Sequence, residues 1–364
     1  MKMGIVGLPN VGKSTLFNAL TDAGAGAANY PFCTIDPNVG VVAVPDNRLD
    51  FLTELYKPKK TTPATVEFLD IAGLVRGASR GEGLGNKFLG HIRSVDAIIH
   101  VVRCFDSTDI THVEGKTDPL RDISIVETEL VLSDLEYLER QIDRLKVALK
   151  GDKTLKTKLD MLERLHEHLD KANSARTFET SSIVEEEYFS SLELLTRKPI
   201  LYVANMDIDG FLNFSENPYF QSLLKHSEKE RAEALPICAK LEEEIMALDE
   251  EDRKPFLEDM QLTEPGLYRV IRKSYALLGL ISFFTAGETE VRAWTIRKGT
   301  RAPQAAGKIH SDFERGFIRA EIISYEDLYR EGSVARAREK GHYRLEGKEY
   351  VMKDGDVTLF RFNV

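Results

Sequence analysis

A glycine-rich segment near the start of the chain has the residue types and spacing that phosphate binding requires. It reads GLPNVGKS over residues 7–14 and fits the pattern G-x-x-x-x-G-K-S. The glycines let successive backbone N–H groups curl around phosphate oxygens, and the N-terminus of a following helix adds positive potential. The segment lies between a predicted strand, MGIVGL, and a helix predicted from Lys13 to Leu20, which is the context this motif needs. We therefore predict a nucleoside triphosphate site here.

Individual side chains of this segment have predictable roles. We expect Lys13 to reach the β- and γ-phosphates as a catalytic residue, and the hydroxyl of Ser14 to ligate Mg²⁺. The loop and the first helical turn together supply the first part of the predicted nucleotide-binding set, which is Asn10, Val11, Gly12, Lys13, Ser14 and Thr15.

A second element complements the phosphate loop. The sequence FLDIAGL places Asp70 at the end of a predicted strand, 64–70, and Gly73 three residues later. An acid at this position can hold Mg²⁺ through water, and the glycine N–H can sense the γ-phosphate, which makes Gly73 a second predicted catalytic residue. Thr34, in NYPFCTIDPN, can offer a hydroxyl and a carbonyl to the same ion, although a structural threonine in a turn is the alternative. The predicted metal ligands are therefore Ser14, Thr34 and Asp70.

Alternating strands and helices must position these groups. Two continuous apolar runs, AIIHVVRCF and PILYVAN, are typical of central strands in a parallel sheet. The pattern predicts an α/β domain with a doubly wound, mostly parallel sheet. Its strands are expected at MGIVGL and at 39–44, 64–70, 97–105, 199–205 and 234–239.

The alternation is interrupted between residues 122 and 198. Apolar residues recur there at steps of three and four, and two long helices paired as an antiparallel coiled coil are the natural interpretation. We expect this stripe to pack against itself rather than to bind a ligand. The stripe consists of Leu135, Leu138, Ile142, Leu145, Leu149, Leu155, Leu159, Leu162 and Leu169.

The composition changes again from about residue 281. We expect a small α+β domain there, with strands around one short helix near 305–313 and a hairpin-type turn at Lys353-Asp354-Gly355. The predicted domains are a nucleotide-binding domain over 1–121 and 199–280, a helical insertion over 122–198, and a C-terminal domain over 281–364.

Taken together, these residues resemble the YchF family, also called Obg-like ATPases, among the Obg-related P-loop NTPases. The resemblance rests on GLPNVGKSTLFNAL, ANYPFCTIDPN, DIAGLVRGAS and FFTAGETEVRAWTI, and it extends over nearly the whole chain. It implies that the C-terminal domain is a TGS domain and that the helical insertion is a coiled coil. It also implies a ribosome-associated nucleotide hydrolase, a partner that composition and spacing do not indicate.

The catalytic water has no conventional partner in this sequence. Ras-like enzymes carry Gln directly after D-x-x-G, whereas this chain has Leu74, so intrinsic turnover should be slow. His112, in a polar loop, is our hypothesis for the group that positions water, and a solvent-exposed loop histidine is the alternative. Asn10 is a second candidate, because in related phosphate loops such an Asn helps to hold K⁺ beside the phosphates.

The segment YVANMDIDGF is predicted to read the base. Asn205 follows a strand as the base-reading Asn of GTPases does, and its amide can bond a purine N7 and brace the phosphate loop. In N-K-x-D, the final Asp selects guanine, and the YchF family resembles N-x-x-E instead. Here the corresponding residue is Ile208, which accepts no hydrogen bond, so guanine selectivity should be lost.

Neighbouring residues complete the expected base site. Met206 replaces the Lys that covers the base, and its sulfur can pack on a purine face. Asp209 could restore guanine selection after a local shift, with turn formation together with Gly210 as the competing role. In PICAK, Cys238 takes the place of a Ser and Ala239 is expected to donate its backbone N–H to the base.

Bulk properties limit the partners. The net charge is −10, which argues against general nucleic-acid binding, although residues 292–319 carry seven cations and two acids, a local balance of +5 that can meet ribosomal RNA. The three cysteines are widely spaced, which favours a reducing compartment. No apolar run is long enough for a membrane span and no signal segment is evident. We expect a cytoplasmic monomer that binds the large ribosomal subunit and no membrane.

The sequence therefore predicts a regulatory ATPase that uses ATP, tolerates GTP and requires Mg²⁺, with K⁺ as a candidate second ion. Two alternatives stay open: a GTP-preferring Obg-like GTPase, and a nucleotide-gated scaffold with negligible turnover. A metabolic kinase is disfavoured, because no segment offers an evident site for a small phosphate acceptor.

Overall fold

The computed structural model describes most of the chain and divides it into two compact units. The first unit contains the first strand and helix together with Glu67–Val270, and the second contains Val41–Val66 and Ile271–Val364. Val41–Val66 groups with the C-terminal segment, although the predicted nucleotide-binding domain included it. The division into three domains remains a prediction. The described residues are 1–23, 38–71, 84–107, 113 and 115–363.

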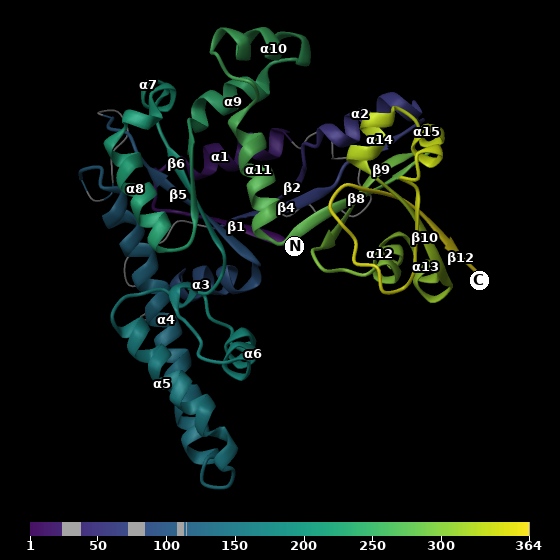
Figure 1. Ribbon diagram of the computed structural model, residues 1–364. Helices are drawn as coiled ribbons and strands as arrows, with labels where there is room; N and C mark the ends of the chain where they lie inside the picture. Colours follow the sequence, from purple (N-terminus) through teal and green to yellow (C-terminus); the bar gives the residue numbers. More distant parts are fainter. Residues whose placement is uncertain (24–37, 72–83, 108–112, 114, 364) are drawn as a thin grey trace. The chain divides into compact units, whose positions relative to one another are not determined.

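Most strands of the first unit belong to a six-stranded sheet of order β2-β4-β1-β5-β6-β7, in which the chain crosses the division between the units within β2 and within β4 (Figure 1). The neighbours from β4 through β7 pair in parallel, which confirms the predicted mostly parallel sheet. β5 and β6 are buried at every position, because helices cover both faces of such a sheet. The strands are β1 (Lys2–Val6), β2 (Val39–Ala43), β4 (Thr65–Asp70), β5 (Ala97–Arg103), β6 (Ile200–Asn205) and β7 (Glu233–Ile237).

The helices of this unit follow the strands in the expected α/β order. The α11 helix continues across the division between the units. The helices are α1 (Lys13–Ala23), α3 (Leu84–Ser94), α4 (Pro119–Ala148), α5 (Lys156–Asp170), α6 (Ile183–Ser191), α7 (Ile208–Leu212), α8 (Pro218–Lys229), α9 (Ala239–Ala247), α10 (Glu250–Asp259) and α11 (Gly266–Leu277), with short 3-10 turns η3 (Lys153–Leu155), η4 (Ala175–Thr177) and η5 (Phe214–Glu216).

The predicted pair of long helices is present as α4 and α5, which pack side by side as a helical hairpin (Figure 1). The predicted apolar stripe forms or lines its core, except for Leu155, and burial of a leucine side chain contributes about 1.5–3 kcal/mol. The stripe residues that are fully buried in this core are Leu138, Ile142, Leu159, Leu162 and Leu169, and those packed at its margin are Leu135, Leu145 and Leu149.

Capping and a buried carboxylate fix the base of this hairpin. Asp118 accepts a hydrogen bond from the Arg121 backbone N–H, and Pro119 follows in the first helical turn. Further along α4, buried Asp134 accepts from the backbone N–H groups of Leu195 and Thr196, each at 2.8 Å. The returning chain is thereby attached to α4 before it enters β6.

The second unit has its own six-stranded sheet, of order β11-β10-β12-β8-β9-β3. A separate apolar core lies on one face of it and includes Phe283, Ile296, Ala306 and Phe360. The strands are β3 (Thr61–Thr62), β8 (Leu280–Ala286), β9 (Val291–Arg297), β10 (Phe317–Ser324), β11 (Arg344–Glu346) and β12 (Asp356–Phe362), and the helices are α2 (Asn47–Tyr56), α12 (Ala302–Ile309), α13 (Ser311–Arg315), α14 (Tyr325–Glu331) and α15 (Val334–Glu339).

Two details of the C-terminal prediction are wrong. The single helix expected near 305–313 is two helices, because His310 is extended (φ −160°, ψ 145°) and its imidazole accepts the Asp312 N–H to start α13. The turn before β12 exists, with Gly355 at φ +89°, but it does not close a hairpin. Instead, β12 pairs with β10 and β8.

Candidate nucleotide-binding site

The predicted phosphate loop connects β1 to α1 and requires glycine at two places. A Cβ on Gly7 would lie 2.7 Å from the carbonyl oxygen of Val101, and Gly12 has φ +91°. Asn10 also has a positive φ, of 63°. The Leu16 N–H bonds to the carbonyl of Gly12, so α1 begins directly behind the loop. The earlier N–H groups of the helix terminus have no intrahelical acceptor and can face an anion.

Asn205 braces this loop from β6. Its side-chain Nδ2 donates to the Val11 carbonyl and its Oδ1 accepts from the Ala239 N–H, both at 2.9 Å. The residue is 5% exposed, so these bonds are largely shielded from water. A Cβ on Gly12 would meet Nδ2 at 2.0 Å, which explains the glycine there as a close approach as well as a backbone requirement. The predicted bracing role is therefore present, and the contact of Asn205 with a purine stays a prediction.

Two predicted base contacts are contradicted. Ala239 donates its N–H to Asn205, so that donor is not directed to a base. Met206 is 2% exposed and its own N–H bonds to the Ile237 carbonyl, because the residue continues the buried strand β6 by one position. Its sulfur therefore packs in the core rather than on a purine face. Cys238, the N-cap of α9, is 1% exposed, and burial raises the pKa of its thiol.

The expected loop after β6 is the short helix α7. Asp207 is its N-cap and accepts the Gly210 N–H at 2.9 Å, so this acid is used locally. Ile208 is 37% exposed at the position where GTPases carry the guanine-reading acid. Asp209 lies one residue further along the helix, about 100° around its axis from Ile208. While α7 remains formed, the Asp209 side chain therefore cannot point in the direction in which the Ile208 side chain points.

Lys13 and Asp70 form an ion pair beside the loop, with side chains 10% and 18% exposed. Asp70 is the last residue of β4 and lies in register with Ile5 of β1, which brings its carboxylate to the end of the sheet where the loop begins. The structure thus brings one predicted phosphate-binding side chain, Lys13, together with one predicted metal ligand, Asp70. Ser14 is exposed in the first turn of α1. A hydroxyl and a carboxylate are hard oxygen donors that fit Mg²⁺.

Several predicted residues lie outside the described part of the chain. These are Thr34, Gly73, Leu74 and His112. Their assigned roles in metal binding, γ-phosphate sensing and water positioning remain predictions.

Comparison with known proteins places this geometry in a family. The family called YchF-GTPase_C, described as a protein of unknown function, matches residues 280–363, and the 50S ribosome-binding GTPase family matches residues 2–133. A Bacillus subtilis protein named ribosome-binding ATPase YchF is 56% identical over 99% of both chains. The chain belongs to the YchF family. The Gallus gallus protein named Obg-like ATPase 1 is 45% identical and covers the whole chain, with 92% of its own length matched.

Solved structures agree with the YchF assignment. The structure of the Schizosaccharomyces pombe YchF GTPase has 42% identity and a TM-score of 0.88, and the match covers 99% of this chain and 97% of that one. A GTP binding protein from Pyrococcus horikoshii, at 21% identity and a TM-score of 0.61, shares the fold. The YchF names differ in the nucleotide they state, ATP for the bacterial relative and GTP for the yeast structure, so the base site of this chain has to be argued from its own residues.

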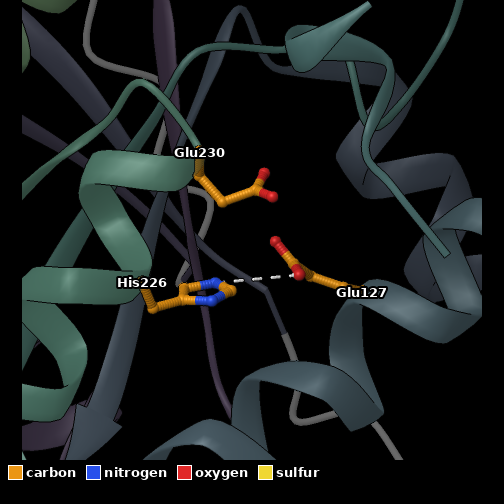
Figure 2. Close-up of side chains that lie close together, drawn as sticks. All are labelled: Glu127, His226 and Glu230. Atoms are coloured by element: carbon orange, nitrogen blue, oxygen red, sulfur yellow. Dashed lines mark ion pairs between the residues drawn. The ribbon is translucent and has the colours of Figure 1, made fainter.

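A polar cluster that sequence reasoning missed lies away from the phosphate loop, between α4 and α8. Glu127, His226 and Glu230 point toward one another, with ligand atoms within 4.8 Å of each other (Figure 2). His226 lies in the last turn of α8 and Glu230 is the C-cap residue of that helix, a spacing of four that is visible in the sequence. Glu127 is distant along the chain, so only the fold reveals the group.

This cluster is already paired internally. The Arg176 guanidinium lies 3.4 Å from a Glu127 oxygen and 3.5 Å from a Glu230 oxygen. Tyr202 donates its hydroxyl to Glu127 at 3.0 Å, and Ser174 donates to Glu230 at 2.5 Å. A cation and two hydroxyls therefore satisfy the two carboxylates, and the arrangement ties α4, α8 and β6 together rather than preparing a metal centre.

Proposed function

We propose that this chain is a ribosome-associated nucleoside triphosphatase that binds ATP at least as well as GTP. The observation that carries the nucleotide choice is Ile208 at the start of α7. Guanine selection requires an acceptor for the base N1–H and 2-amino group, and a site built on such bonds discriminates by about 10⁴–10⁵. Asp207 caps α7, and Asp209 lies on another side of that helix. Neither acid supplies the missing acceptor.

The residues around the phosphate loop fit hydrolysis that requires Mg²⁺. The ion supplies charge neutralisation at the phosphates, and Ser14 and Asp70 would hold it together with Thr34. Lys13 would turn from Asp70 to the β- and γ-phosphates when MgATP binds. Leu74 offers no group to orient water, so we expect slow intrinsic turnover, with His112 and a K⁺ held near Asn10 as the candidates that raise it.

Ribosome association is supported by the relatives' names and by the match to the 50S ribosome-binding GTPase family. We propose that the chain acts as a monomer in the cytoplasm. None of the helices in the described part of the chain combines the length and hydropathy that a membrane crossing requires.

Calorimetric titration with MgATP and MgGTP tests the nucleotide assignment. We expect dissociation constants within about tenfold of each other, because both purines can use Asn205 and neither finds an acid at position 208. Ile208→Glu should favour GTP, whereas Leu212→Glu, at the exposed end of the same helix, should not. A preference of the unmodified chain for GTP by 100-fold or more would contradict the proposal. Phosphate release with and without 50S subunits then tests the hydrolase assignment.

A further inference from the structure

The loop between α4 and α5 forms a strongly basic end of the helical hairpin. We call residues 144–158 the hairpin apex. It reads RLKVALKGDKTLKTK and carries six cations and one acid, a balance of +5 in a chain whose net charge is −10. It lies at the end of the hairpin furthest from the sheet of the first unit (Figure 1). Asp143 and Asp160 flank it on the two helices.

Most of the apical cations are exposed, and among the described residues they have no acidic partner. Arg144, Lys150, Lys153 and Lys156 are exposed, and within the described part of the chain none forms an ion pair within 4.0 Å. Of the other two, Lys146 pairs with Glu163 at 3.2 Å and Lys158 lies over the Tyr188 ring. The acid of the apex, Asp152, is the N-cap of η3 and accepts from the N–H and hydroxyl of Thr154.

The basic segment of the second unit is different. Its local excess of +5 is reduced by acids that fold against it, two of which come from outside the counted residues. Arg301 pairs with Glu349 at 2.7 Å and Arg319 pairs with Glu321 at 3.1 Å. Arg315 pairs with Asp312. With the paired outside acids counted, the balance of that segment falls from +5 to +3, whereas the hairpin apex, whose Lys146 pairs with Glu163, keeps +4.

The chemistry of the apex matches a phosphate backbone. Its cations are mostly lysines, which act as flexible point charges for phosphate oxygens, and residues 144–158 contain no aromatic side chain for base stacking. The same lack of aromatics removes the interfacial anchors expected of a membrane-binding segment. Val147, 69% exposed, is the largest apolar exposure there. The expected contact is electrostatic, independent of base sequence and sensitive to salt.

We propose that the hairpin apex binds the RNA phosphate backbone of the large ribosomal subunit, an inference that rests on the proposed ribosome association. The lysines that carry the contact are Lys150, Lys153 and Lys156. Glu127 of α4 accepts a hydrogen bond from Tyr202 of β6, and β6 ends at Asn205, which braces the phosphate loop. The helix that carries the apex is therefore connected to the nucleotide site through β6.

The test is the salt dependence of 50S binding by the full chain, measured by co-sedimentation between 50 and 300 mM salt. In the triple variant Lys150→Gln, Lys153→Gln, Lys156→Gln, the negative slope of log K against log salt should become shallower by about 2 to 3, since each phosphate contact contributes about 0.7–0.9 to its magnitude. Near 0.15 M salt, this corresponds to a roughly 100-fold loss of affinity. Hydrolysis in the absence of ribosomes should be unchanged.

The matched control is Lys225→Gln, Lys229→Gln, Lys254→Gln, which removes the same net charge from exposed sites elsewhere in the first unit. The control should bind 50S subunits like the unmodified chain. If the apex variant binds 50S subunits as tightly as the unmodified chain, or if the control loses as much affinity as the apex variant, the inference is overturned but ribosome association stands. Absence of 50S binding by the unmodified chain overturns both. Binding to phosphatidylserine vesicles with the same loss in the apex variant would assign the apex to anionic membranes and also overturn it.

Discussion

At the scale of single residues, Asn205 is the point where the phosphate loop, β6 and α9 are joined. It is nearly buried, and each end of its amide has a backbone partner, Val11 on one side and Ala239 on the other. Both partners lose their bond if the amide is removed, and an unsatisfied buried polar group costs about 1–3 kcal/mol. The residue therefore supports the shape of the site whatever base is bound.

Asn205→Ala should lower the free energy of unfolding by roughly 2–4 kcal/mol and weaken ATP binding, because the loop loses its brace. Urea unfolding and calorimetric titration measure the two effects. Asn213→Ala, at an exposed position after α7, is the control and should change stability by less than about 0.5 kcal/mol. Unchanged stability and affinity in Asn205→Ala would show that the loop holds its conformation without this side chain.

At the scale of elements, Glu242 connects α9 to the start of α11. It is fully buried, and its carboxylate accepts from the backbone N–H groups of Gly266 and Leu267, at 2.8 and 3.2 Å. Burial raises the pKa of this carboxyl to about 7, although the two hydrogen bonds act in the opposite direction. The desolvation cost of the charged carboxylate is therefore larger than the stabilisation that the two N–H groups at the start of α11 give it.

This raised pKa predicts a pH dependence of folding. An unfolded glutamate ionises near its usual value of 4.5, so between pH 4.5 and 7 the folded chain keeps a proton that the unfolded chain has lost. The contribution of Glu242 to stability should therefore fall as the pH rises through this window and level off above 7, by up to about 3 kcal/mol. Urea unfolding from pH 5 to 8 measures it.

Glu242→Gln should remove this part of the slope, because the amide does not titrate. Glu243→Gln, at the exposed neighbouring position of α9, should leave the slope as it is in the unmodified chain. If the Glu242→Gln and unmodified proteins lose stability in parallel between pH 5 and 7, Glu242 does not titrate in this window.

The elements also show what the sequence could predict. The strands β5 and β6 were predictable because continuous apolar runs of this length require burial on both faces, and the hairpin was predictable from its leucine spacing. The helix α7 was missed because its start depends on the Asp207 cap within a segment that reads as a turn. The break between α12 and α13 likewise depends on one histidine side chain.

Side-chain placement was less predictable than the elements. The sequence placed Asn205 and Lys13 at the site because their motifs fix a backbone position. It could not show that Met206 points into the core or that Ala239 gives its N–H to Asn205, because both follow from contacts between distant segments. The cluster of Glu127, His226 and Glu230 was missed for the same reason.

At the scale of the whole molecule, the two compact units differ in what they can bind. The phosphate loop, Asp70 and Asn205 all belong to the first unit. A ligand stabilises the unit that holds its site, by about 2.7 kcal/mol at a concentration 100 times its dissociation constant. The second unit has its own sheet and its own core, so its unfolding need not follow that of the first.

Differential scanning calorimetry should therefore show two transitions, of which only one moves to higher temperature when MgATP is added. Lys13→Ala should abolish this shift and leave the other transition in place, since the ammonium is needed for the phosphates. Lys225→Ala, exposed on α8, is the matched control and should retain the shift. If a single transition moves as a whole, the units unfold cooperatively. The chain crosses their division within β2, β4 and α11, and these three elements would then couple nucleotide binding in the first unit to the stability of the second.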